Sequence, residues 1–146
     1  MSKREMDDYS YQAGVIDCFN EMVHAGVKTL AMSHPCSTKE ERDAFLPFCE
    51  EICSKYQTKY YPEDEAFLTD LFPEELNRGK YNILFYRTDE VLEAYLALKK
   101  EQKRLQQENG YTQEERRRIA AAFGRMLSYT DEAVARLIYE TQNRCM

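Results

Sequence analysis

Tyr81-Asn82-Ile83-Leu84-Phe85-Tyr86 is the stretch on which the arrangement of the chain depends. Gly79 precedes it closely, and Arg87-Thr88-Asp89-Glu90 follow it directly. A short apolar and aromatic run between a turn residue and a helix start is typical of a buried strand. The sequence therefore predicts a central strand at residues 81–86 that leads into a helix at Thr88.

The composition is that of a globular protein. The chain has 146 residues, of which 43% are hydrophobic and 32% are charged, which is enough apolar material for one domain and excludes a disordered chain. No window of about 18 apolar residues is present, so we expect no membrane span. The first residues lack the apolar core of a secretory signal, and the five cysteines are an odd number without a CxxC pair. We therefore expect reduced thiols and a cytoplasmic location.

Charge is unevenly distributed along the chain. Residues 1–98 carry ten Lys and Arg against nineteen Asp and Glu, whereas residues 99–146 carry ten against seven. The basic part includes the run Arg116-Arg117-Arg118, but glutamates surround it and no aromatic residues are interleaved. Because the whole chain is acidic, with a net charge of −6, we expect these to be solvated helix faces and do not expect a nucleic-acid partner.

Helical and extended patterns alternate along the first 110 residues. Apolar spacing predicts a helix over 9–25, and a short β-branched run predicts a strand over 27–33. The capping box Ser37-Thr38-Lys39-Glu40 predicts a helix that Pro47 either kinks or divides in two. A polar edge strand is expected over 57–62, and an irregular stretch with a short helical turn over 63–79.

Three helices are expected after the central strand. They begin at Thr88, Thr112 and Thr130, each of which precedes acidic residues and then apolar residues at helical spacing. Gly124 lies inside the second of these helices, where glycine costs about 1 kcal/mol relative to alanine, and it indicates close helix packing.

The order of elements predicts an α/β fold. We expect a small three-layer domain, in which a short, mostly parallel sheet of about three strands is flanked by helices. Residues 1–146 would form a single domain, with an α/β core over 1–110 and a C-terminal helical pair over 111–146 packed on it. A mostly α-helical bundle that absorbs the strand segments is the alternative.

Parallel strands would place the candidate site at their carboxyl ends. The ligand-binding residues expected there are Ser33, Ser37, Glu63, Asp64, Arg87 and Thr88. The candidate catalytic residues are His34, Cys36 and Asp70, because an imidazole beside a carboxylate suits acid–base chemistry and a thiol before a helix has a lowered pKa. The spacing of these groups matches no metal signature, so no metal ligand is assigned.

Cys36 and Arg42 are separated by five residues, and His34-Pro35 precede them. The spacing resembles the phosphate loop of cysteine-dependent phosphatases, and the resemblance implies a thiolate nucleophile and an arginine that holds the phosphate oxygens. The segment departs from that pattern because it contains no glycine, includes two glutamates, and is followed by Asp43. A capping box at Ser37 would also direct Arg42 away from Cys36, so a buried structural thiol is the preferred interpretation.

Two functional hypotheses follow. The first is a domain that binds a polar or anionic small molecule at the strand ends, with or without a metal ion. The second is a non-catalytic interaction or self-association module that uses the C-terminal helices, with a homodimer as its simplest form. The sequence identifies no cofactor, and whether the chain is an enzyme stays open. A concave pocket with converging polar groups would favour the first hypothesis, and an exposed apolar patch on the helices would favour the second.

Overall fold

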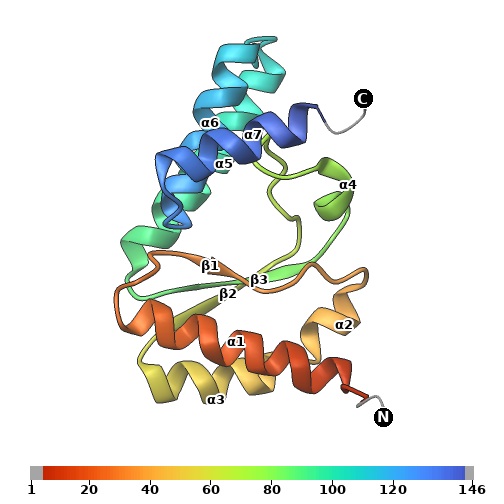
Figure 1. Ribbon diagram of the computed structural model, residues 1–146, viewed down its shortest axis with the longest axis vertical. Coiled ribbons are helices and arrows are strands. Elements are labelled where there is room, and N and C mark those ends of the chain that lie inside the picture. The colour runs from red at the N-terminus through yellow and green to blue at the C-terminus, as the bar shows by residue number, and fades with distance from the viewer. Residues whose placement is uncertain (1–4, 144–146) are drawn as a thin grey trace.

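A three-stranded sheet lies between two layers of helices in the computed structural model, which describes residues 5–143 (Figure 1). The first layer contains α1 (Asp8–His24), the short α2 (Lys39–Asp43) and α3 (Leu46–Tyr56). The second contains α5 (Asp89–Gln107), α6 (Gln113–Met126) and α7 (Asp131–Gln142). The short helix α4 (Glu74–Asn77) lies in the connection before the last strand.

The sheet is antiparallel throughout. Strand β3 (Asn82–Tyr86) occupies its centre, and β1 (Ala31–Met32) and β2 (Lys59–Glu63) pair with β3 on either side in the order β1-β3-β2. Both flanking strands run antiparallel to β3, with Leu84 opposite Met32 on one side and Tyr61 on the other. All five residues of β3 are buried, which confirms the central strand predicted from the sequence.

The expected mostly parallel sheet is therefore wrong, and the mostly helical alternative is closer to the structure. The crossover through α2 and α3 does bring β2 back in the same direction as β1, because both are antiparallel to β3. The third strand then returns between them in the opposite direction. Antiparallel strands need no crossover helix. In the connection from Glu63 to Asn82, the only helix is α4, which has four residues. The result is a split β-α-β unit rather than a parallel series.

The two helical layers cover opposite faces of the sheet. The first helix packs with α3 on one face, and α5 joins the C-terminal pair on the other. Alternate residues of β3 supply the two cores. Ile83 and Phe85 pack against α1 and α3, and Leu84 and Tyr86 pack against the C-terminal helices.

Local signals account for most helix boundaries. Pro47 lies in the first turn of α3, where its missing N–H is not needed, so the residue divides two helices rather than kinking one. Thr38, not Ser37, caps α2 by accepting a hydrogen bond from the Glu41 N–H. Helices α6 and α7 begin at the expected threonines, Thr112 and Thr130.

Close packing joins α6 to α7. A Cβ atom added to Gly124 would lie 2.6 Å from Cγ2 of Val134, which confirms that this glycine marks a close helix contact. Lys28, just after α1, donates a hydrogen bond to the carbonyl of Leu127, so the two helical layers also meet around the sheet edge. No helix between residues 5 and 143 is both long and apolar enough to cross a membrane.

Candidate functional site

The antiparallel sheet separates the residues that the sequence had placed together. The ends of β1 and β2 lie beside the start of β3, because Glu63 is opposite Asn82 and Cys36 bridges to Tyr81. Arg87 and Thr88 follow the other end of β3, where Lys59 at the start of β2 forms an ion pair with Asp89. The predicted rim therefore splits between opposite ends of the sheet.

Ser33, His34 and Cys36 have structural partners at the first of these ends. The Ser33 hydroxyl accepts a hydrogen bond from the Ile83 N–H at 2.9 Å. The Cys36 thiol is buried and lies 3.4 Å from Nε2 of His34, while Nδ1 of His34 is buried and has no hydrogen-bond partner among residues 5–143. Burial raises the pKa of the Cys36 thiol and lowers the pKa of His34, so it favours the neutral form of both groups. The shift at Cys36 is opposite to the one expected from its place before a helix.

Within residues 5–143, Arg42 forms no hydrogen bond with Cys36, although its charge acts on that thiol. Its side chain is 1% exposed, and the guanidinium donates hydrogen bonds to the carbonyl oxygens of Glu63 at 2.9 Å and Asn82 at 3.1 Å. It also bonds to Asp64 at 2.6 Å, which lowers the pKa of that carboxyl. Arg42 thus joins β2 to β3, and the resemblance to a phosphatase loop does not extend to its geometry.

The remaining predicted ligand-binding residues lie on the surface. Ser37 accepts a hydrogen bond from Nζ of Lys80 at 3.0 Å. Thr88 occupies the N-cap position of α5 without a side-chain cap, and Arg87 beside it is exposed. None of the three lines the groove described next.

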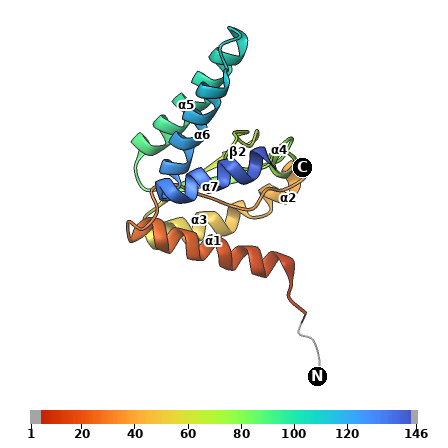
Figure 2. The ribbon, with the colours of Figure 1, turned by 45° about the horizontal axis from the view of Figure 1, so that its top comes forward.

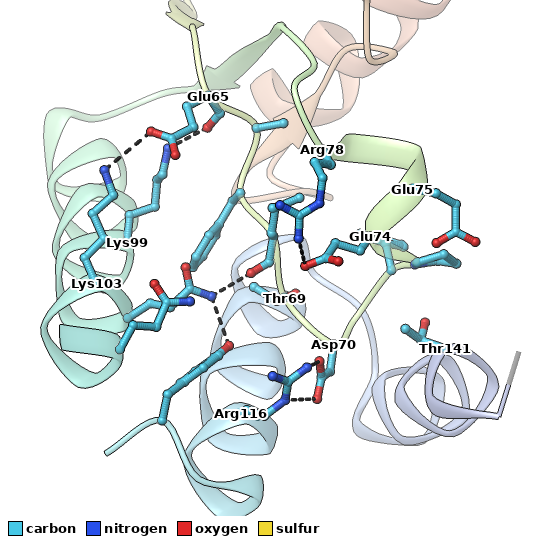
Figure 3. A pocket seen from close by; sticks show the side chains of 18 of the residues that line it. Glu65, Thr69, Asp70, Glu74, Glu75, Arg78, Lys99, Lys103, Arg116 and Thr141 are labelled. Carbon is cyan, nitrogen blue, oxygen red and sulfur yellow. Dashed lines mark hydrogen bonds and ion pairs between the residues drawn. The ribbon is translucent and has the colours of Figure 1, made fainter. Parts of the chain in front are cut away.

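A polar groove of about 1000 Å³ opens beside the irregular connection (Figure 3). Its walls are residues 65–70, 72–75 and 78 of that connection, together with side chains from α5, from the start of α6 and from the end of α7. Asp70 is the one predicted catalytic residue in these walls. His34 lies elsewhere, packed edge-on against Phe45 in the other helical layer.

Asp70 and Arg116 form a bidentate pair in the groove. Nε of Arg116 donates to Oδ2 at 3.0 Å and Nη2 donates to Oδ1 at 2.6 Å, and this carboxylate raises the pKa of the guanidinium. Nε2 of Gln142, at the end of α7, lies 3.4 Å from Oδ2. The pair therefore fixes three segments that are far apart in the sequence, and the paired arrangement is visible in Figure 3.

Gln102 and Tyr111 form a second fixed group. The amide nitrogen of Gln102 donates to the carbonyl of Leu68 at 2.6 Å and to the Tyr111 hydroxyl at 2.9 Å. Gln102 is 7% exposed, and its amide oxygen accepts no hydrogen bond from any residue between 5 and 143. The Arg116 guanidinium lies 5.3 Å from the centre of the Tyr111 ring. A buried amide, a phenol and a guanidinium are thus held side by side.

The third group contains two lysines of α5. Nζ of Lys99 donates to Oε2 of Glu63 at 3.0 Å and to the carbonyl of Glu65 at 2.6 Å. Lys103 pairs with the Glu65 carboxylate at 3.4 Å. Glu63 itself is buried and also accepts a 2.6 Å hydrogen bond from the Tyr95 hydroxyl. Glu63, which was predicted to bind a ligand, therefore holds Lys99 in place through this ion pair and does not line the groove itself.

Two residues of the groove that were not predicted as site residues do carry a signal in the sequence. Arg116 lies near the start of α6, where a positive charge opposes the helix dipole and therefore indicates a carboxylate partner. Gln102 lies on the apolar face of α5 with Leu98 and Leu105, and a polar residue on such a face is normally held by hydrogen bonds.

Within residues 5–143, no group of three or more His, Cys, Asp or Glu side chains is arranged to hold a metal ion. Comparison of the chain with protein-family models, with curated proteins and with solved structures finds no match. The groove is therefore the feature from which a function must be inferred.

Proposed function

We propose that the chain is a binding domain for a polar small molecule, held in the groove between residues 64–79 and helices α5, α6 and α7. The observation that carries the proposal is the set of fixed polar groups around Asp70 and Arg116. A volume of about 1000 Å³ accommodates a small molecule, and binding sites commonly combine a concave surface with a few oriented polar groups.

The charges of the groove favour a neutral or zwitterionic ligand over a polyanion. The walls contain the cations Arg78, Lys99, Lys103 and Arg116 and the carboxylates Glu65, Asp70, Glu74 and Glu75. Because the two signs are equal in number, a nucleotide or other polyphosphate would meet as much repulsion as attraction. A ligand with one anionic group and several N–H or O–H groups, such as an amino acid or a short peptide, suits this surface.

Individual atoms are free to contact such a ligand. Nη1 of Arg116 is not engaged by Asp70 and suits one carboxylate oxygen, and the amide oxygen of Gln102 suits an N–H or O–H donor. Both groups are already oriented, so less conformational entropy is lost on binding. The proposed site uses no metal, and the cytoplasmic location of the chain stays a prediction from its sequence.

A thermal-shift screen tests the proposal. The purified chain is mixed with amino acids, short peptides, sugars, sugar phosphates and nucleotides, and a specific ligand at one hundred times its dissociation constant stabilises the fold by about 2.7 kcal/mol. We expect the stabilising compounds to come from the neutral and zwitterionic classes. Stabilisation by polyphosphates alone would contradict the charge argument, and a screen without any stabilising compound would contradict the proposal.

A pair of adjacent glutamines provides the matched control. Gln106 lines the groove and Gln107 does not, and both are exposed on the last turn of α5. The substitution Gln106→Trp should occupy part of the groove and abolish the thermal shift, whereas Gln107→Trp should leave the shift intact. Equal effects of the two substitutions would place the ligand elsewhere.

A further inference from the structure

A second concave surface, the apolar groove, runs along α6 and α7. It has a volume of about 520 Å³, and its walls include Ala121, Ala135, Ile138, Tyr139, Arg117 and Arg125. Tyr139 is 67% exposed, which is high for an aromatic side chain beside an apolar surface. Surfaces of this kind on a small protein commonly bind another polypeptide.

The charged side chains that line the apolar groove are Arg117, Arg125 and Asp131, and their net positive charge favours acidic partners. Arg116 and Arg118 in the same basic run are engaged by Asp70 and by Glu101 and Glu115, respectively. Arg117, by contrast, has no ion pair with any residue between 5 and 143. Arg125 lies 3.5 Å from Asp131, but both side chains are largely exposed and such a pair contributes little. The occupant should therefore combine apolar and acidic side chains.

The N-terminal segment, residues 5–11, has this combination. Met6 is 72% exposed and lies between Glu5 and Asp7, and Tyr11, in the first turn of α1, is 51% exposed and follows Asp8 by three residues. Figure 2 shows that residues 5–7, which precede α1, are directed away from the rest of the molecule. Large apolar side chains are thus presented to solvent beside carboxylates, on a segment that has room to meet another surface.

The two surfaces of one copy face different layers. The N-terminal segment belongs to the layer of α1 and α3, and the apolar groove belongs to the layer of α6 and α7, with the sheet between them (Figure 1). A short segment at the start of α1 cannot cross the sheet to reach the groove of its own chain. We propose that the chain self-associates, and that residues 5–11 of one copy occupy the apolar groove of a second copy. Reciprocal exchange of the segments produces a closed dimer with two-fold symmetry.

The contact should be weak and dependent on salt. A segment of seven residues covers less surface than the standard stable interface, so the dimer belongs with transient associations. Contacts between arginines and exposed carboxylates are screened as ionic strength rises. We therefore expect the dimer fraction to rise with protein concentration and to fall when salt is added.

Sedimentation equilibrium of the full chain tests the proposal. Met6→Asp removes the apolar side chain from the segment, and Ala135→Asp places a carboxylate in the groove against the acidic segment. Each substitution is at an exposed position and should weaken dimerisation at least about tenfold, equivalent to about 1.4 kcal/mol. Arg136→Glu, at the neighbouring exposed residue outside the groove, is the control and should leave the association unchanged.

Two results would overturn the proposal. The first is the mass of a single chain at every concentration in low salt. The second is a dimer that either Met6→Asp or Ala135→Asp fails to weaken, because the contact needs both surfaces. Neither residue lines the polar groove, so the thermal shift of the ligand screen should survive both substitutions and the two proposals fail independently.

Discussion

At the scale of single residues, Asp70 and Arg116 form an ion pair in which the carboxylate is much more buried than the guanidinium. The Asp70 side chain is 10% exposed and the Arg116 side chain is 45% exposed, so only the guanidinium reaches water when its partner is lost. Arg116→Gln leaves a buried carboxylate without its charged partner and should lower the free energy of unfolding by about 2 kcal/mol. Asp70→Asn should cost less, about 1 kcal/mol. Urea denaturation of the two variants measures the difference, and a larger loss for Asp70→Asn would contradict the burial argument.

Substitution of Arg42 should also lower the stability of the fold. Its substitution by Met removes the hydrogen bonds to the carbonyl oxygens of Glu63 and Asn82 and the ion pair with Asp64, and should cost about 3 kcal/mol in unfolding free energy. Lysine keeps the charge but lacks the planar array of donors, so Arg42→Lys should recover only part of the loss. Arg87→Ala, at an exposed position, is the control and should change stability by less than about 0.5 kcal/mol.

His34 makes stability depend on pH. Burial lowers its pKa in the folded chain from the ordinary value of 6.5, so the unfolded chain binds the proton more readily. Stability should therefore be complete above pH 6.5 and should fall as the pH drops through the interval between 6.5 and the lower folded pKa. Chemical denaturation between neutral and mildly acidic pH should show this slope, and His34→Gln should flatten it. An unchanged slope in the variant would assign the dependence to other groups.

At the scale of elements, the close contact of α6 with α7 requires a residue without a side chain at Gly124. Alanine has the higher helix propensity by about 1 kcal/mol, but its Cβ would lie 2.6 Å from Cγ2 of Val134. Gly124→Ala should therefore lower the melting temperature instead of raising it. The double variant Gly124→Ala with Val134→Ala removes the clash and should be more stable than the sum of the two single changes predicts. Additive effects would show that the helices separate freely.

Local elements could be predicted from the sequence because their signals are local. Threonine caps, Pro47 and the apolar run at Ile83 specify helix starts and a central strand within a few residues of themselves. Strand direction has no such signal, since it depends on how the chain returns through residues 64–81. The one indication of an antiparallel return was that this stretch contains no long crossover helix. Of its residues, only Asp70 was predicted to be catalytic. Arg116 lies 46 residues further on, and no local pattern links the two.

Cooperativity is the property that belongs to the whole molecule. Phe85 supplies one core and Leu84 the other, from adjacent positions of the same buried strand. Phe85→Ala and Leu84→Ala should each cost about 3 kcal/mol or more. Both should also raise amide exchange in both helical layers together, because either change weakens β3. Selective exchange in α6 and α7 alone would instead define residues 111–146 as a separate folding unit.

The two outer strands have a consequence for how this molecule behaves when it is crowded. In the described chain β1 has only two residues, and β2 carries the exposed Lys59 and Pro62, which has no N–H to donate. Short or interrupted edges of this kind do not template the addition of further strands. Amyloid-like stacking needs a long, regular edge, and the native molecule exposes none within residues 5–143, so concentrated solutions should stay free of fibrils as long as the chain is folded.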